Sequence, residues 1–207
     1  MKKEKSTVVE LSSVAGDAPR RRRDAVATRQ AILDSARAAF ARAGYDGAGV
    51  REIAQGAGVT AMLVNRYFGS KEALFAEAVE TSMATTTVVL PRILKSGASG
   101  SEIAAALISI TEAGDTPLEG FQMMLHSAGS PRAAEIARGL IEKHHLKAIA
   151  SALGGEQASQ RAAAMLALIA GFQLMRQSIG MSALSAAKPA ALVKVLGPLF
   201  DQLMAPK

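Results

Sequence analysis

Two short helical segments separated by a glycine-rich turn constrain the fold of this chain more than any other feature of its sequence. The first segment runs from about Val50 to Gln55, and the second runs from Ala61 to Tyr67. Gly58 lies between them, where a sharp turn needs a residue that tolerates a positive φ. Thr60 can cap the second segment, because its hydroxyl can accept a hydrogen bond from a free backbone N–H. This pattern is typical of the helix-turn-helix, in which the second helix can protrude into a DNA groove.

Helical patterns flank this motif on both sides. One helix begins at Ala25 and stops at Gly44, and Tyr45 can fold back onto its apolar face, which is formed by Ile32, Ala36, Phe40 and Ala43. Within the motif we expect inward-facing side chains at Val50, Ile53, Ala54, Ala57, either Leu63 or Val64, and Phe68. Ser70 can cap a further helix whose inward stripe is Leu74, Phe75, Ala78 and Val79. Residues 25–80 are therefore expected to form one small helical domain.

The N-terminal residues 1–24 are polar and lack periodicity, which predicts a disordered arm that ends in the run Arg20–Arg23. The arm contains seven Lys and Arg against four Asp and Glu, whereas residues 25–80 contain six of each. Such an arm can be a solvated tail, or it can lie along DNA phosphates or enter a minor groove. The sequence leaves both interpretations open.

Composition narrows the class of protein. A hydrophobic fraction of 49% with only 4% aromatic residues favours an all-α fold. The absence of Cys excludes disulfides, Cys-type zinc sites and thiol nucleophiles. The sequence has no nucleophile elbow, phosphate-binding loop, dinucleotide fingerprint or zinc motif, so we expect neither enzymatic activity nor a cofactor. His144-His145 has no second cluster of metal ligands, so we expect no metal site. No apolar run approaches the ~18 residues of a membrane span, and the N-terminus does not resemble a signal peptide. We therefore expect a cytoplasmic protein.

Residues 81–207 have a helical texture broken by Gly, Pro and Ser clusters, including one near Pro91. The breaks predict helices at about 102–113, 117–128, 132–153, 156–179 and 190–204. The segment 162–179 is apolar nearly all round, so one side can face its own domain while the other needs a partner. The last helix also has a broad apolar stripe, and two such helices per chain could form a four-helix bundle across a two-fold axis. The candidate dimer-interface residues are Met165, Ile169, Phe172, Ile179, Leu192, Val195, Leu196, Leu199 and Phe200, although a fully intramolecular core would explain the same pattern.

The stretch 28–79 resembles the DNA-binding domain of the tetracycline-repressor (TetR) family. The resemblance is carried by Ile32-Leu33, Ala36, Phe40, Gly44-Tyr45, Val50, Ile53-Ala54, Ala57-Gly58-Val59-Thr60, Tyr67-Phe68, Ser70-Lys71-Glu72 and Leu74. It implies that residues 60–67 form the recognition helix, with Ala61, Met62 and Leu63 at base edges. It also implies that Thr60, Tyr67 and Lys71 hold phosphates and that Arg51 contacts a phosphate or a guanine.

Several positions depart from the family pattern. Ala48 and Gly49 stand where Thr or Ser often caps the first helix of the motif, and Asn65 stands where a Tyr commonly contacts phosphate. Tyr67 replaces a common His, so Arg66 becomes the strongest exposed donor on this helix, able to grip either guanine or phosphate. The alternatives are that Tyr67 packs in the core, that Lys71 is simply solvated, and that Arg51 pairs with Asp46 or Glu52.

The resemblance further implies a homodimer that binds double-stranded DNA and a pocket for a small molecule in residues 81–207. A dimer would read a near-palindrome with half-sites roughly one turn, ~34–36 Å, apart. The candidate pocket walls, for which core packing is the alternative, are Met83, Phe121, Met124, Leu125, His126, His144, Phe172 and Met175. The expected function is a repressor released by an apolar or amphipathic ligand. The alternative is a helical interaction module whose helix-turn-helix does not read DNA.

Overall fold

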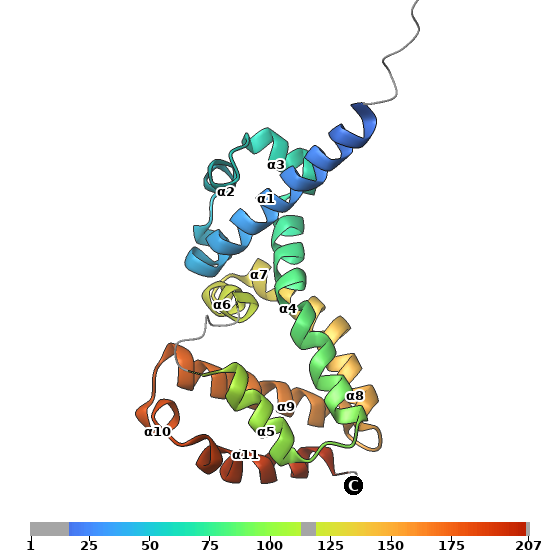
Figure 1. Ribbon diagram of the computed structural model, residues 1–207, viewed down its shortest axis with the longest axis vertical. Helices are drawn as coiled ribbons and strands as arrows, with labels where there is room; N and C mark the ends of the chain where they lie inside the picture. Colours follow the sequence, from blue (N-terminus) through green and yellow to red (C-terminus); the bar gives the residue numbers. More distant parts are fainter. Residues whose placement is uncertain (1–16, 113–118, 206–207) are drawn as a thin grey trace, which may run out of the picture.

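A computed structural model describes residues 17–112 and 119–205, with side chains omitted for 17–23 and 84–88. Its regular structure within these ranges is helical throughout, as expected (Figure 1). The N-terminal region contains α1 (Asp17–Gly47), α2 (Val50–Gly56), α3 (Ala61–Phe68) and the start of α4 (Lys71–Lys95). The remainder contains α5 (Gly100–Ile110), α6 (Glu119–Ser127), α7 (Pro131–Leu140), the π-helical η1 (Ile141–Leu146), α8 (Lys147–Leu153), α9 (Ala158–Gln173), the π-helical η2 (Leu174–Ser178), α10 (Ser182–Ser185) and α11 (Pro189–Met204). No described helix is long and apolar enough to cross a bilayer.

Aromatic packing organises the N-terminal core. The ring of Phe75 on α4 packs edge-on against Phe40 at 5.0 Å and against Tyr45 at 5.2 Å between centroids. Gly44, with a φ of 67°, interrupts α1 and allows Tyr45 to fold back onto this cluster, as predicted. Val64 is buried and Leu63 only partly so, which identifies Val64 as the residue that anchors α3.

Helix α4 links the two regions of the molecule (Figure 1). The predicted break near Pro91 is wrong, because α4 continues through Pro91 to Lys95. Proline removes one helical hydrogen bond, but Leu90, Ile93 and Leu94 pack against the second core and hold the helix together. The expected domain boundary at residues 80 and 81 therefore lies inside a continuous helix.

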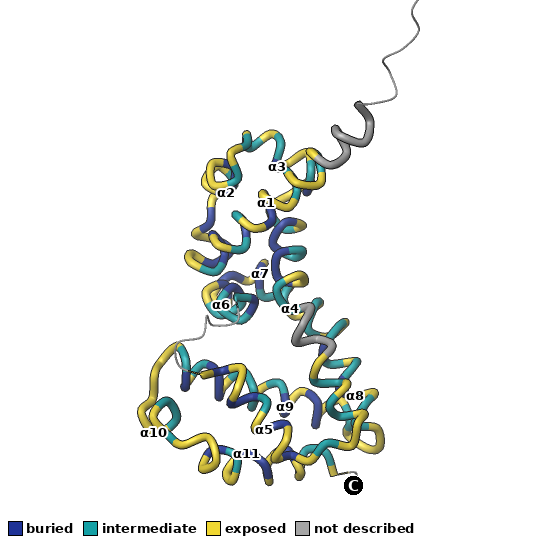
Figure 2. Tube along the Cα trace, viewed as in Figure 1, coloured by how far each residue is buried: buried dark blue, intermediate teal, exposed yellow. Residues whose placement is uncertain are grey.

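The second core lies between α5, α8, α9 and α11 (Figure 2). Helices α5 and α11 approach closely because Gly100 and Gly197 face each other: a Cβ at Gly100 would lie 2.1 Å from the Gly197 carbonyl oxygen. Arg161 on α9 fixes the end of α11 by donating to the carbonyl oxygens of Leu203, Met204 and Ala205 at 3.2–3.3 Å. These contacts join the C-terminal helices into a single packed unit.

Several predicted helix boundaries need correction. Helix α1 begins at Asp17, so the run Arg20–Arg23 is helical rather than disordered, since Arg and Ala favour helices and Asp and Pro suit a first turn. The rest of the expected arm, residues 1–16, lies outside the described residues. The predicted helix 132–153 contains the π-helical turn η1, and the one at 156–179 begins at Ala158 and ends in η2. The short α10 falls in a stretch predicted as a break.

Candidate nucleic-acid interface and ligand cavity

Local hydrogen bonds fix α3 relative to α2. The Val59 N–H donates to the Ala54 carbonyl at 2.9 Å across the turn, where Gly58 has a φ of 66°. The Leu63 N–H donates to the Thr60 hydroxyl at 3.3 Å, which is the predicted cap. Gly49 caps α2 without a side-chain hydrogen bond. The helix-turn-helix is therefore formed by the sequence features that predicted it.

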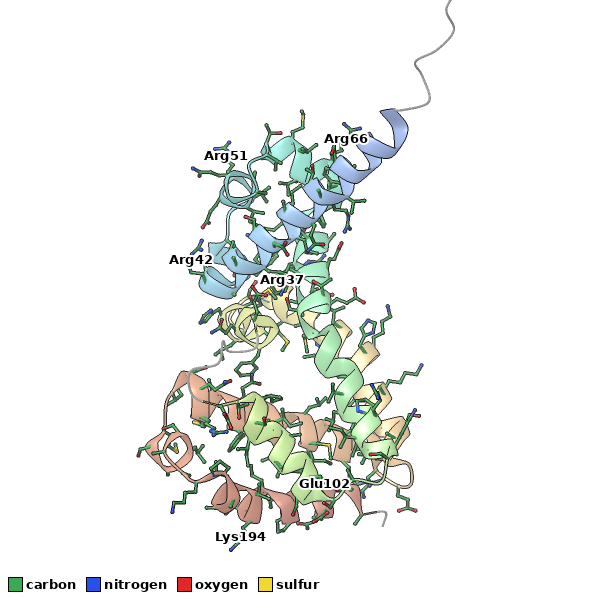
Figure 3. All side chains as sticks on the ribbon, viewed as in Figure 1. Arg37, Arg42, Arg51, Arg66, Glu102 and Lys194 are labelled. Atoms are coloured by element: carbon green, nitrogen blue, oxygen red, sulfur yellow. The ribbon has the colours of Figure 1, made fainter. Side chains whose placement is uncertain are left out.

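One face of α3 is exposed at the end of the molecule. Met62 is 80% exposed, and Thr60, Asn65 and Arg66 are also exposed. Ala61, Leu63 and Tyr67 are half-buried, and Ala61 and Tyr67 pack against the N-terminal core. Figure 3 places Arg51 and Arg66 at this same end, with both side chains directed away from the ribbon. The surface thus combines an apolar tip, an amide and two cations.

The cations near this surface differ in their partners. Glu52 pairs with Arg42, and Asp46 accepts a hydrogen bond from Ser130 at 3.1 Å. Among the described residues, Arg51 therefore forms no ion pair with Asp46 or Glu52, the two partners considered from the sequence. The Lys71 ammonium lies 4.6 Å from the centroid of the Tyr45 ring, a cation–π contact. The pKa of Tyr45 is raised above its ordinary value, mainly by burial and secondly by the nearby Glu72 carboxylate.

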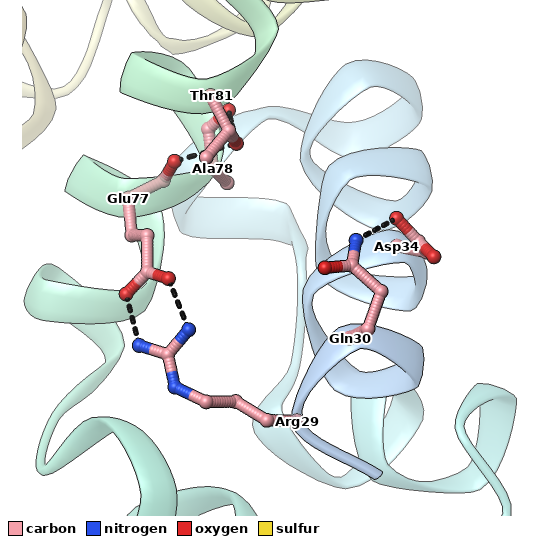
Figure 4. A network of polar contacts seen from close by, with 6 residues as sticks. All are labelled: Arg29, Gln30, Asp34, Glu77, Ala78 and Thr81. Atoms are coloured by element: carbon pink, nitrogen blue, oxygen red, sulfur yellow. Dashed lines mark hydrogen bonds and ion pairs between the residues drawn. The ribbon is translucent and has the colours of Figure 1, made fainter. Parts of the chain in front are cut away.

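An ion pair that the sequence did not reveal joins α1 to α4 (Figure 4). Arg29 donates to both carboxylate oxygens of Glu77, at 2.5 and 2.7 Å. Its guanidinium also lies 4.6 Å from the centroid of the Phe68 ring at the end of α3. The hydrogen bond to Glu77 raises the pKa of Arg29. Arg29 thus contacts α4, which packs on α3, and the end of α3 itself.

A second junction joins α1 to α6. Ser127 accepts a hydrogen bond from the Tyr45 N–H at 2.9 Å, and Arg37 forms an ion pair with Glu119. His126, one of the expected pocket walls, is exposed, and its Nδ1 shares a hydrogen bond with the Ala41 carbonyl. Gly44 packs directly on this junction, since a Cβ there would lie 2.3 Å from the His126 carbonyl oxygen. The N-terminal helices are therefore in direct contact with the C-terminal region.

A cavity of about 220 Å³ lies between α4, α5, α6, η1, α8 and α9. Met83, Phe121 and Met124 line it, as expected. The other expected walls, Leu125, His126, His144, Phe172 and Met175, are not among its lining residues. Phe172 is buried in the second core, Met175 is exposed, and His144 Nε2 lies 3.3 Å from a Glu80 carboxylate oxygen. A more open hollow of about 460 Å³ lies between α6, α7, η1 and α9.

Sequence reasoning missed three polar side chains that line this cavity. They are Ser82 on α4, His145 on η1 and Gln173 on α9. Gln173 carried a readable signal, because it is a polar residue within a helix that is otherwise apolar nearly all round. Burial, and then the neighbouring His144, lowers the pKa of His145. The lining of the cavity is thus apolar with a few neutral polar groups.

The predicted dimer-interface residues fall into two groups, buried and exposed. Met165, Phe172, Leu192, Leu196 and Phe200 are buried within the chain's own second core, so little of their surface is left for a partner. Ile169 is partly buried against the same core. Ile179, Val195 and Leu199 remain exposed, at 65%, 66% and 43%.

The described residues contain no cluster of His, Asp and Glu suited to a metal ion.

Comparison with known protein families agrees with this architecture. Residues 32–78 match the model described as bacterial regulatory proteins of the tetR family. Residues 98–204, more than half of the chain, match the tetracyclin repressor-like C-terminal domain. The protein belongs to the TetR family of bacterial regulatory proteins.

Individual relatives show the same relationship. The chain is 40% identical over 65 residues to the HTH-type transcriptional repressor AcnR of Corynebacterium efficiens, and the match spans 31% of each protein. A transcriptional regulator from Rhodococcus sp. Rha1 is 26% identical, with a TM-score of 0.60 over 85% of this chain and 95% of that one. A transcriptional regulator from Pseudomonas aeruginosa PAO1 is 20% identical and shares the fold, with a TM-score of 0.62 over 90% and 91%.

Proposed function

We propose that this protein is a transcriptional repressor that binds near-palindromic DNA as a homodimer and is released when a small molecule occupies the cavity. The observation that carries the proposal is the exposed face of α3 at the free end of the molecule, with Met62, Asn65 and Arg66 uncovered. A helix presented in this way can enter the major groove. Because the proposed target is DNA, we propose that the protein acts in the cytoplasm.

The roles of the DNA-facing residues follow from position and chemistry. Ala61, Met62 and Leu63 lie in the first turn of α3, which approaches the base edges most closely in this motif. Met62 can offer apolar contact to a thymine methyl, and Arg66 can grip guanine or phosphate. Thr60, Asn65, Tyr67 and Lys71 are proposed to contact the DNA backbone, and Arg51 is proposed to contact a phosphate or a guanine. Lys71 would exchange its contact with the Tyr45 ring for a phosphate.

The proposed dimer uses the outer faces of α9 and α11. Exposed positions on α11 include Ala191, Val195 and Leu199, spaced by four residues on one side of the helix. Exposed positions on α9 include Ala164, Ala167 and Gly171. These apolar stripes suit close packing of two helices from each chain around a two-fold axis.

Release by a ligand is supported by the contacts around the cavity. Gly120 and Phe121 of α6 line it, and α6 also contacts α1 through Ser127 and His126. Met83 of α4 lines it, and α4 continues back to the N-terminal core. A ligand that binds better to one position of α6 and α4 would therefore bias the position of α1 and of α3.

Selection from a random double-stranded DNA library at about physiological salt tests the proposal. A near-palindromic consensus is the expected result. Arg66→Ala should weaken binding to the selected site, whereas Arg92→Ala, an exposed arginine in the last turn of α4, should leave it unchanged. Salt-sensitive binding without a consensus would instead favour the interaction-module alternative.

A further inference from the structure

Two buried polar atoms in the cavity wall lack a partner among the described residues. Gln173 is only 3% exposed, and its Nε2 has no hydrogen bond. The Ser82 Oγ, on the α4 side of the same cavity, is also buried and unbonded. Buried polar groups are nearly always hydrogen-bonded, because an unmade bond is costly. These two groups are explained if their partner is a molecule that enters the cavity.

The charge of the wall restricts the chemistry of such a molecule. Among the described residues that line the cavity, none is Asp, Glu, Lys or Arg. His145 is the one titratable group among these described lining residues, and burial lowers its pKa, which keeps its ring uncharged at pH 7. Transferring an ion into such a site without a counter-charge is strongly unfavourable. The cavity therefore disfavours both anions and cations.

The volume of the cavity sets the size of the molecule that it can hold. An apolar cavity of about 150 Å³ holds benzene, so 220 Å³ has room for about nine or ten non-hydrogen atoms. The wall residues contributed by α5 are Ile103, Ala106, Leu107 and Ile110, which offer only apolar contact. Most of the ligand surface must accordingly be apolar.

We propose that the cavity takes a neutral, mainly apolar molecule of about this size that carries a carbonyl-type acceptor for the Gln173 amide. The identification of this molecule as the effector rests on the proposed function, whereas its binding does not. Gln177 provides a matched control, because its amide is also buried and unbonded but does not line the cavity. Both side chains lie on the continuous α9–η2 run, one turn apart.

The test uses isosteric probes on the full-length protein without DNA. Acetophenone carries the acceptor, α-methylstyrene replaces the carbonyl oxygen with a methylene, benzoate is the anion and benzamidinium is the cation. Dissociation constants are measured by ligand-observed NMR at pH 7. Acetophenone is expected to bind at least about tenfold more tightly than either ion. Gln173→Leu should lower the preference for acetophenone over α-methylstyrene about fivefold, and Gln177→Leu should leave it unchanged.

Three results would overturn the proposal: benzoate or benzamidinium binding as tightly as acetophenone, an unchanged preference in Gln173→Leu, or no binding of any probe. If the variants fail to fold, comparing the dissociation constants of acetophenone and the two ions on the unmodified protein still tests the proposal. Failure to select a DNA consensus would contradict the proposed function and leave these binding results standing, so the two can fail separately.

Discussion

Substituting Gly44 by Ala should destabilise the protein more than the same substitution at Gly58. Both glycines have a positive φ, 67° and 66°, so both variants strain the backbone. They differ in what a new Cβ would meet. At Gly58 nothing lies within 4 Å, whereas at Gly44 the Cβ would lie 2.3 Å from the carbonyl oxygen of His126 and 2.8 Å from its carbonyl carbon.

The magnitudes follow from this difference. Positive φ costs an alanine about 1–2 kcal/mol, which is the whole expected effect at Gly58. At Gly44 the ψ of −178° places the residue in a region nearly restricted to glycine, at a cost of about 1–3 kcal/mol. Overpacking against the α6 backbone adds about 1–3 kcal/mol, because a backbone carbonyl moves only with its helix. Gly44→Ala should therefore exceed Gly58→Ala by about 2 kcal/mol.

Urea unfolding of both variants at one protein concentration measures the difference, and fixing the concentration holds any dimerisation term constant. In a thermal scan the extra loss corresponds to a Tm lower by about 4–8 °C, at roughly 2–4 °C per kcal/mol for a chain of this size. Equal stabilities of the two variants would refute the close α1–α6 contact and, with it, the proposed route from the cavity to α3.

Three further outcomes are expected. Arg29→Ala should lower the free energy of unfolding by about 1–2 kcal/mol, since it removes a partly exposed ion pair and a cation–π contact. Arg29→Lys should recover only part of this loss, because an ammonium group lacks the planar fork that donates to both Glu77 oxygens, and an Arg29→Lys variant as stable as the unmodified protein in urea unfolding would argue against the paired geometry. Val195→Asp should shift the molecular mass measured by light scattering towards the monomer, while Val26→Asp, at a valine of similar exposure on α1, should not; a dimer in both variants would contradict the proposed interface. The pKa of His145 is lowered on folding, so the unfolded chain binds the proton first and the free energy of unfolding should fall as the pH drops below about 6.5. His145→Gln should reduce this pH dependence, which urea titrations at several pH values measure. An identical pH profile in the variant would exclude His145 as the source of the dependence.

Features encoded within a few residues were predictable from the sequence. The turn at Gly58 and the caps at Thr60 and Ser70 depend on local backbone chemistry, and the structure confirms all three. The choice between Leu63 and Val64 depended on packing against helices distant in the sequence, so periodicity alone left it open.

Long-range features were not predictable in the same way. Arg29 and Glu77 are 48 residues apart, and nothing local indicates their pairing. The apolar stripe of α11 was recognised, but periodicity could not show that Leu192 and Leu196 face the chain's own core while Val195 faces outwards. Pro91 indicated a break because its local cost is visible in the sequence, whereas the packing of α4 on the second core is not.

The claim that α3 reads DNA bases is tested most directly by repeating the random-library selection with a Met62→Gln variant beside the unmodified protein. Met62 is 80% exposed, so the substitution should leave the fold intact. A glutamine amide can bond the adenine edge, which Met cannot. A near-palindromic consensus for the unmodified protein, altered in the variant at symmetric positions of both half-sites, is the expected result. The absence of a consensus for the unmodified protein, or an identical consensus for both, would contradict the claim.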